Sequence, residues 1–173
     1  MSRKLPKIIT REEFEKILKE EDNKQYRLAF LLGFESGMRI SEVVGLKVKG
    51  QYKIHPLTKD KIEGNSIRIE QGKGAKDRIV PKPKRLNDKA LSLLPIKLSR
   101  RSLEYRIKAL GKRVLNKEIT FHTLRHGFGS HLANGGRPLH EIQILMGHSN
   151  LSTTGIYLHA NPKEAIKKAE ELF

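Results

Sequence analysis

The sequence predicts a mainly α-helical domain that carries one small antiparallel β-sheet. Apolar side chains recur at helical spacing in the N-terminal quarter of the chain and again from residue 86 onward. Between these regions lie short segments rich in isoleucine and valine, separated by turn residues. A chain of 173 residues is long enough to bury one core without disulfides. We therefore expect a single α+β domain over residues 1–173.

The first helix is expected within residues 9–21. Thr10 is suited to cap the first turn, and Glu13 is placed to reach back to it, which together form a capping box. The apolar stripe that follows consists of Phe14, Ile17 and Leu18. These features indicate a surface helix with one face in the core.

Two further helices are expected in residues 23–37 and 38–46. Leucines recur at helical spacing in the first of these segments, and Gly37 supplies a left-handed stop at its end. The second segment begins directly afterwards, with Glu42 in its first turn. Arg39 is therefore predicted to lie in a tight junction between two helices.

The middle of the chain changes to the short period of β-strands. The turn sequences KDKIEG and GKGAK divide it into strands. The expected strands cover residues 51–57, 65–71 and 76–82. We interpret them as one antiparallel sheet in which residues 71–78 form an exposed hairpin.

The second half of the chain is expected to be helical throughout. A proline-rich connection at residues 80–84 leads into it. The predicted helices lie within residues 86–94, 99–116, 122–136, 138–148, 151–159 and 161–173.

The charge of the chain points to a polyanionic partner. There are 35 Lys and Arg residues against 19 Asp and Glu residues, which gives a formal net charge of +16. This excess exceeds what solubility requires, and a nucleic acid is the partner that we expect. A merely solvated basic surface is the alternative interpretation.

The sequence also bears on the compartment. It contains no cysteine, which excludes disulfides, thiolate metal sites and cysteine nucleophiles. It shows neither the apolar run of a signal peptide nor a stretch long enough to span a bilayer. We expect a cytoplasmic protein with no membrane association.

The segment FHTLRHGFGSHLANGG carries the first chemical signal. His122 and Arg125 are three residues apart, so they share one helix face and are placed to reach a single phosphate. His122 and His126 also have the spacing of a zinc-binding helix. Thr123 stands where a metalloprotease helix has its glutamate, however, and we expect no metal.

The sequence lacks the residues that metal-dependent nucleases and nucleotide hydrolases need. The few aspartates lie in lysine-containing stretches rather than in the clusters that two-metal nucleases need. No phosphate-binding GxxxxGK[ST] loop is present. What remains is metal-free attack on a phosphodiester, which needs a nucleophile, cations for the non-bridging oxygens and an acid for the leaving oxygen.

The chain resembles the tyrosine recombinase (integrase) family, and especially its Xer-like members. Four motifs carry the resemblance in the family's order and spacing: SGMRISEVVGL, GKGAKDRIVP, HTLRHGFGSHLANGG and LMGHSNLSTTGIYLH. The resemblance extends from about Leu5 to the C-terminus and implies the catalytic-domain fold of that family.

The resemblance also implies a role for each matching residue. Tyr157 is expected to attack the scissile phosphate and form a 3′-phosphotyrosyl bond without a cofactor. Arg39 and Arg125 are expected to hold the non-bridging oxygens, and Lys73 to protonate the leaving 5′-oxygen. The expected aids to proton transfer and phosphate positioning are His122 and His148, with Glu42 bracing the cluster from behind. Further expected DNA contacts are Lys76, Arg78, Lys82 and Lys84.

In one respect the chain departs from the family. Family members carry an N-terminal DNA-binding domain, whereas here the motifs begin almost at Met1, so we expect a catalytic domain alone. The resemblance implies a monomer in isolation and a tetramer on paired DNA sites. A non-catalytic DNA-binding module that regulates recombination is the alternative function, and a type IB topoisomerase is a near relative in chemistry.

Overall fold

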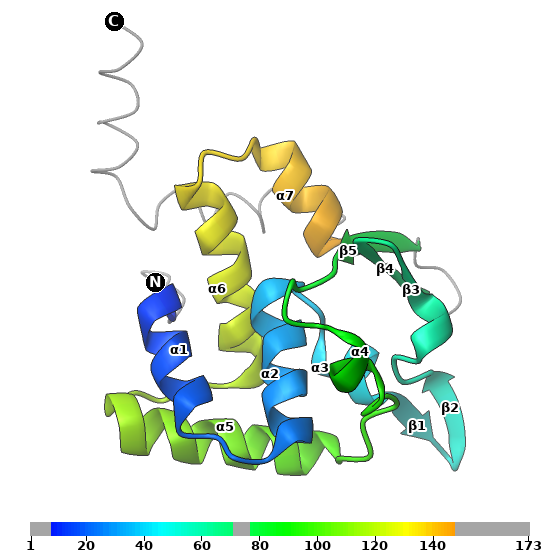
Figure 1. Cartoon of the computed structure of the whole chain (residues 1–173), viewed down its shortest axis with the longest axis horizontal. Coiled ribbons are helices and arrows are strands. Elements are labelled where there is room, and N and C mark those ends of the chain that lie inside the picture. The colour runs from blue at the N-terminus through cyan, green and yellow to red at the C-terminus, as the bar shows by residue number, and fades with distance from the viewer. Residues whose placement is uncertain (1–7, 71–76, 148–173) are drawn as a thin grey trace, which may run out of the picture.

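Helices form most of the structure, a computed structural model that describes residues 8–70 and 77–147 (Figure 1). Helices α2 and α6 pack against each other at the centre, with α1 and α5 beside them. The described α-helices are α1 (Arg11–Lys19), α2 (Lys24–Glu35), α3 (Ile40–Val44), α4 (Asp88–Leu91), α5 (Arg100–Leu115), α6 (Phe121–Asn134) and α7 (Leu139–Met146). The predicted mainly α-helical fold is confirmed.

The first helix begins as its sequence predicts. The hydroxyl of Thr10 accepts a hydrogen bond from the backbone N–H of Glu13, and the carboxylate of Glu13 accepts one from the N–H of Thr10. The predicted apolar stripe is buried: Phe14, Ile17 and Leu18. The capping box and the stripe therefore fix both the start of α1 and the face it turns to the core.

The junction between α2 and α3 depends on Gly37. Its φ of +64° lies in the left-handed region, and an added Cβ would lie 2.4 Å from the ring of Phe128. Both constraints require glycine here. The chain then enters α3 at once, with Arg39 as the residue before the helix.

The strands form two small antiparallel sheets rather than the single sheet predicted. One has the order β1 (Leu46–Val48) and β2 (Gln51–Ile54). The other has the order β3 (Ile62–Glu63), β4 (Ser66–Ile69) and β5 (Arg78–Pro81). A short 3₁₀ helix, Lys59–Lys61, precedes β3.

The prediction was therefore wrong in assigning residues 51–57 to the sheet of the two later strands. Lys49 and Gly50 both have positive φ, +51° and +81°, which makes a tight hairpin that pairs Val48 with Gln51. The predicted turn at 59–64 instead holds the 3₁₀ helix and β3, which takes the place of the missing third strand.

The core divides unequally between two clusters. The larger one joins α1, α2, α5 and α6 with the inward face of the three-stranded sheet. The smaller one consists of Phe128 from α6 with Ile142 and Met146 from α7. Helix α7 also packs against β5, so its C-terminal end lies between the helices and the three-stranded sheet.

No described helix is long and apolar enough to cross a membrane. The predicted helices within residues 151–159 and 161–173 lie outside the described residues, as do residues 71–76 of the predicted hairpin.

Candidate active site

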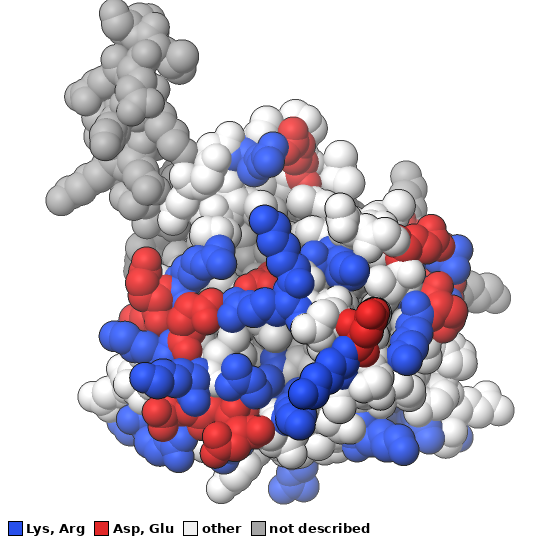
Figure 2. Space-filling view, viewed as in Figure 1, with Lys and Arg blue, Asp and Glu red and all other residues white. Residues whose placement is uncertain are grey.

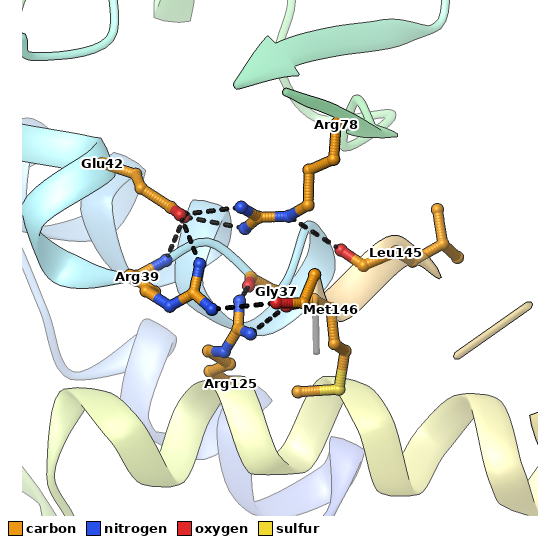
Figure 3. A network of polar contacts seen from close by, with 8 residues as sticks. Gly37, Arg39, Glu42, Arg78, Arg125, Leu145 and Met146 are labelled. Carbon is orange, nitrogen blue, oxygen red and sulfur yellow. Dashed lines mark hydrogen bonds and ion pairs between the residues drawn. The ribbon is translucent and has the colours of Figure 1, made fainter. Parts of the chain in front are cut away.

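Arg39 projects from the junction of α2 and α3 towards the end of α7 (Figure 3). Its Nη1 donates to Oε1 of Glu42 over 2.8 Å, and its backbone N–H donates to Oε2 of the same carboxylate over 2.6 Å. Its Nη2 donates to the carbonyl of Gly147 over 3.2 Å. The side chain nevertheless stays 37% exposed, so part of it faces solvent.

Glu42 lies behind Arg39 and is held by a second arginine. Nη1 and Nη2 of Arg78 donate to its two carboxylate oxygens, each over 2.8 Å, and both side chains are buried. Burial opposes ionisation of Glu42, but the hydrogen bonds and charge of Arg78, with those of Arg39, lower its pKa. Glu42 is therefore an anion at neutral pH.

Arg125 comes from the middle of α6 and is 2% exposed. Nη1 donates to the carbonyl of Gly37, and Nη2 donates to the carbonyl of Met146. The guanidinium thus joins α6 to the α2–α3 junction and to the end of α7. A buried arginine needs such partners, because an unpaired buried cation is costly.

The three arginines meet at the C-terminal end of α7. Nε of Arg78 donates to the carbonyl of Leu145 over 3.1 Å, and the next two carbonyls accept from Arg125 and Arg39 as described above. The last carbonyls of a helix have no partner within the helix and carry partial negative charge. The end of α7 therefore holds the arginines together despite their like charges.

His122 lies one turn before Arg125 on α6, and its side chain is exposed. Its ring meets that of His126 edge-on, with 4.2 Å between the ring centroids. Desolvation lowers the pKa of His122, as do the positive charges of Arg125 and Arg39. These influences favour the neutral imidazole, which is the form able to accept a proton.

Within residues 8–70 and 77–147 no three His, Asp or Glu side chains are grouped so that they could hold a metal ion. The pair His122 and His126 therefore stands without a third ligand in this part of the chain.

The other predicted residues have different positions. Lys82 and Lys84 follow β5, the first half-buried and the second exposed. Arg78 was predicted to contact DNA, but its side chain is 4% exposed and its guanidinium binds Glu42 and α7. The predicted residues that lie outside the described residues are Lys73, Lys76, His148 and Tyr157.

Sequence reasoning missed the contact between Arg78 and Glu42. The signal for it was the period of two along β5, in which Arg78 and Val80 are buried while Ile79 is 59% exposed. An arginine that shares a strand face with a core valine points inward and needs a buried anion. In the structure this buried anion is the carboxylate of Glu42.

Charged side chains of both signs cover the face shown in Figure 2. Three ion pairs connect α1 and the two residues after it with α5 and the second residue after α5: Lys117–Glu13, Arg113–Glu20 and Arg106–Glu21. Their cations are partly neutralised by their neighbours. On this face the basic excess of the chain is therefore mixed with acidic side chains.

Comparison with known proteins identifies relatives over nearly the whole chain. The model of the phage integrase family matches residues 92–164. This segment contains four of the predicted catalytic residues: His122, Arg125, His148 and Tyr157. Tyrosine recombinase XerA of Thermococcus kodakarensis is 37% identical over 98% of this chain and 63% of its own length. The chain thus spans less than two thirds of that relative.

Solved structures agree with the fold. A crystal structure of XerA recombinase matches 98% of this chain and 66% of its own, with a TM-score of 0.73 and 21% identity. XerH site-specific recombinase, in a pre-cleavage complex with its difH substrate, matches 97% of this chain and 55% of its own, with a TM-score of 0.67 and 25% identity. The helical arrangement and the small sheets are therefore shared with the folds of these recombinases.

Proposed function

This chain belongs to the phage integrase family of tyrosine recombinases, and we propose that it cuts and rejoins DNA strands through Tyr157. The phenolic oxygen attacks the scissile phosphorus, the P–Oη bond forms, and the P–O5′ bond breaks. The products are a 3′-phosphotyrosyl link and a free 5′-hydroxyl. Because one phosphodiester replaces another, a 5′-hydroxyl reverses the attack without energy from a nucleotide.

The convergence of Arg39 and Arg125 carries this proposal. These residues are far apart in sequence, yet their guanidiniums donate to adjacent carbonyls, those of Gly147 and Met146. Two guanidiniums side by side place positive charge where two non-bridging phosphoryl oxygens need it in the transition state. The partly exposed Arg39 also offers donors, whereas both Nη atoms of the buried Arg125 already donate to carbonyls. The same carbonyls stand immediately before position 148, where the motif that leads to Tyr157 continues.

We assign the proton transfers to the remaining matched residues. A neutral His122 beside the two arginines is suited to accept the tyrosine proton, directly or through the phosphate, and His148 assists it. Lys73 donates a proton to the departing 5′-oxygen. The tyrosine proton moves within the protein to His122, which becomes cationic, and Lys73 becomes neutral as its proton passes to the 5′-oxygen, so the summed charge of these side chains is unchanged.

Double-stranded DNA is the proposed substrate and partner. The net charge of +16 favours a polyanion, and a structural relative was solved in complex with a DNA substrate. In this proposal residues 1–173 act as one catalytic domain in the cytoplasm, monomeric alone and tetrameric on paired sites. Lys76, Lys82 and Lys84 supply phosphate contacts around the cleaved strand.

Covalent trapping tests the proposal. A pool of nicked duplexes with randomised sequence around the nick is incubated with protein at low salt in EDTA, so that loss of a short 5′-hydroxyl fragment prevents religation. We expect a denaturation-resistant protein–DNA adduct that disappears in Tyr157→Phe and persists in Tyr52→Phe, which alters an exposed tyrosine of β2. Salt-sensitive binding without an adduct in any variant would instead identify a DNA-binding module.

A further inference from the structure

Arg78 occupies a position from which it contacts three parts of the site at once. It is the first residue of β5, its two Nη atoms bind both oxygens of Glu42, and its Nε binds the carbonyl of Leu145 at the end of α7. Sheet, α3 and α7 thus meet on one buried guanidinium (Figure 3).

Glu42 can orient Arg39 only if its own carboxylate is fixed. Oε1 accepts from Nη1 of both arginines, and Oε2 accepts from the backbone N–H of Arg39 and from Nη2 of Arg78. A carboxylate offers about four acceptor sites, so this one is fully used. Arg78 supplies half of the donors and, through its planar fork, sets the plane of the carboxylate.

The end of α7 depends on the same guanidinium. Arg78 binds the carbonyl of Leu145, while Arg39 binds that of Gly147 two residues later. Gly147 allows this approach, because an added Cβ would lie 2.8 Å from Cδ of Arg78. A shift of Arg78 would therefore move both supports of the Arg39 guanidinium, namely Glu42 and the α7 carbonyls.

We propose that Arg78 is a positioning residue for DNA cleavage, which acts through Glu42 and the end of α7 to hold Arg39 against the scissile phosphate. The inference rests on the proposed function, since it assigns Arg39 to the phosphate. Arg78 itself contacts no substrate. Its loss should slow the chemical step and leave the affinity for DNA nearly unchanged.

The test compares two duplexes whose cleaved phosphate has first been mapped from the Tyr157 adduct. One carries the natural phosphodiester and the other a methylphosphonate, in which a methyl group replaces one non-bridging oxygen and removes the charge. An arginine that neutralises this charge matters less when the charge is absent. Rates of adduct formation are measured at saturating protein, beside the dissociation constant for DNA.

For Arg78→Met we expect adduct formation on the phosphodiester to slow by about 10–100-fold, as for loss of a group that orients a catalytic residue. On the methylphosphonate the defect should shrink to below about threefold, in parallel with Arg39→Met, and the dissociation constant should stay within about threefold of wild type. Arg68→Met, which removes an exposed arginine from the adjacent strand β4, should match wild type on both duplexes.

Arg78→Lys provides a second variant if the methionine variant folds poorly. It keeps the positive charge but cannot bridge both oxygens of Glu42, so the same dependence on substrate charge is expected with a smaller defect. A defect of equal size on both duplexes, or wild-type rates on both, would overturn the inference. If wild type itself forms no adduct, the proposed function fails instead, and the two failures are thereby distinguished.

Discussion

Gly147 packs directly against the aliphatic part of Arg78. Its φ is +57°, and an added Cβ would lie 2.8 Å from Cδ of the arginine. Gly64, between β3 and β4, has a similar φ of +55° but nothing within 4 Å of an added Cβ. A comparison of alanine variants at the two glycines therefore distinguishes the cost of backbone strain from the effect of the contact with Arg78.

Gly147→Ala should accordingly lose more stability than Gly64→Ala. Both variants incur about 1–2 kcal/mol for the left-handed conformation, and only the first also displaces a buried ion pair. Unfolding in urea measures the stability, and covalent trapping measures activity, which should fall only in Gly147→Ala. Equal losses in the two variants would show that the contact with Arg78 has no energetic consequence.

The ion pair of Glu42 should make stability depend on pH in the acid range. Its pKa is lower in the folded protein than in the unfolded chain, so its contribution is complete above the unfolded value of about 4.3 and is lost as the pH falls through the folded value. The difference in unfolding free energy between wild type and Glu42→Gln should thus be constant from pH 7 to about pH 5 and shrink below about pH 4. A difference that is the same at pH 3 and pH 7 would contradict the ionised pair.

Local signals made the helical part of the fold predictable. Thr10 and Glu13 are three residues apart and form their capping box within one turn, and Gly37 ends α2 through its own backbone conformation. Such features need no knowledge of distant residues. The helix starts, the stop at Gly37 and the placement of Arg39 were therefore accessible from the sequence.

The sheets and the ion pair were less accessible because they depend on distant pairing. The hairpin at Lys49 and Gly50 places a lysine at positive φ, which is unusual for that residue and gave no turn signal. Glu42 and Arg78 are brought together only in the folded chain, where β5 packs against α7 and its Arg78 reaches Glu42 on α3. The positive charge of Arg78 suggested that it binds DNA. In the structure its side chain is buried and binds the carboxylate of Glu42 instead.

Even lysine should be unable to replace Arg125 without a loss of stability and activity. Its guanidinium satisfies the carbonyls of Gly37 and Met146 at once, and a lysine ammonium on a single stem cannot reproduce this fork. We expect Arg125→Lys to lower the free energy of unfolding by about 1–3 kcal/mol and to slow adduct formation by about 10²–10³-fold. Arg113→Lys, at a side chain that is 58% exposed, should stay within about 0.5 kcal/mol of wild type. An Arg125→Lys protein as stable as wild type would contradict the bridging role of this guanidinium.

Lys82 and Lys84 should contribute to DNA affinity through phosphates and not through bases. If each makes one phosphate contact, replacing both by alanine lowers the slope of log K against log salt by about 1.8, since each contact contributes about 0.9. Arg85 is already bound by Glu15 and Glu35, so Arg85→Gln should leave that slope unchanged. Titrations of a labelled duplex between low and moderate salt measure both slopes. An unchanged slope in the double lysine variant would remove these residues from the DNA interface.

The pKa of His122 should depend on the positive charges of the two neighbouring arginines, Arg125 and Arg39. Desolvation, Arg125 and Arg39 lower its pKa in that order, so Arg39→Met should raise it while Arg68→Met leaves it unchanged, as measured by NMR of the imidazole ring. Neutral His122 is the form that accepts the tyrosine proton. Adduct formation should therefore be constant at pH values above the pKa of His122 and fall as the pH drops through it.

The titration of His122 also lowers stability in acid, as that of Glu42 does, although folding favours the neutral form of His122 and the ionised form of Glu42. Because the folded pKa of His122 lies below the unfolded value of about 6.5, protonation favours the unfolded chain, and stability decreases as the pH falls from about 6.5 towards the folded pKa. His122→Asn should remove this decrease.

In wild type, bound DNA brings a phosphate anion to the arginines and should raise the pKa of His122 towards its ordinary range. A pKa that does not respond to Arg39→Met would mean that the arginine charge does not reach the histidine, and that it does not set the protonation state of the proposed base.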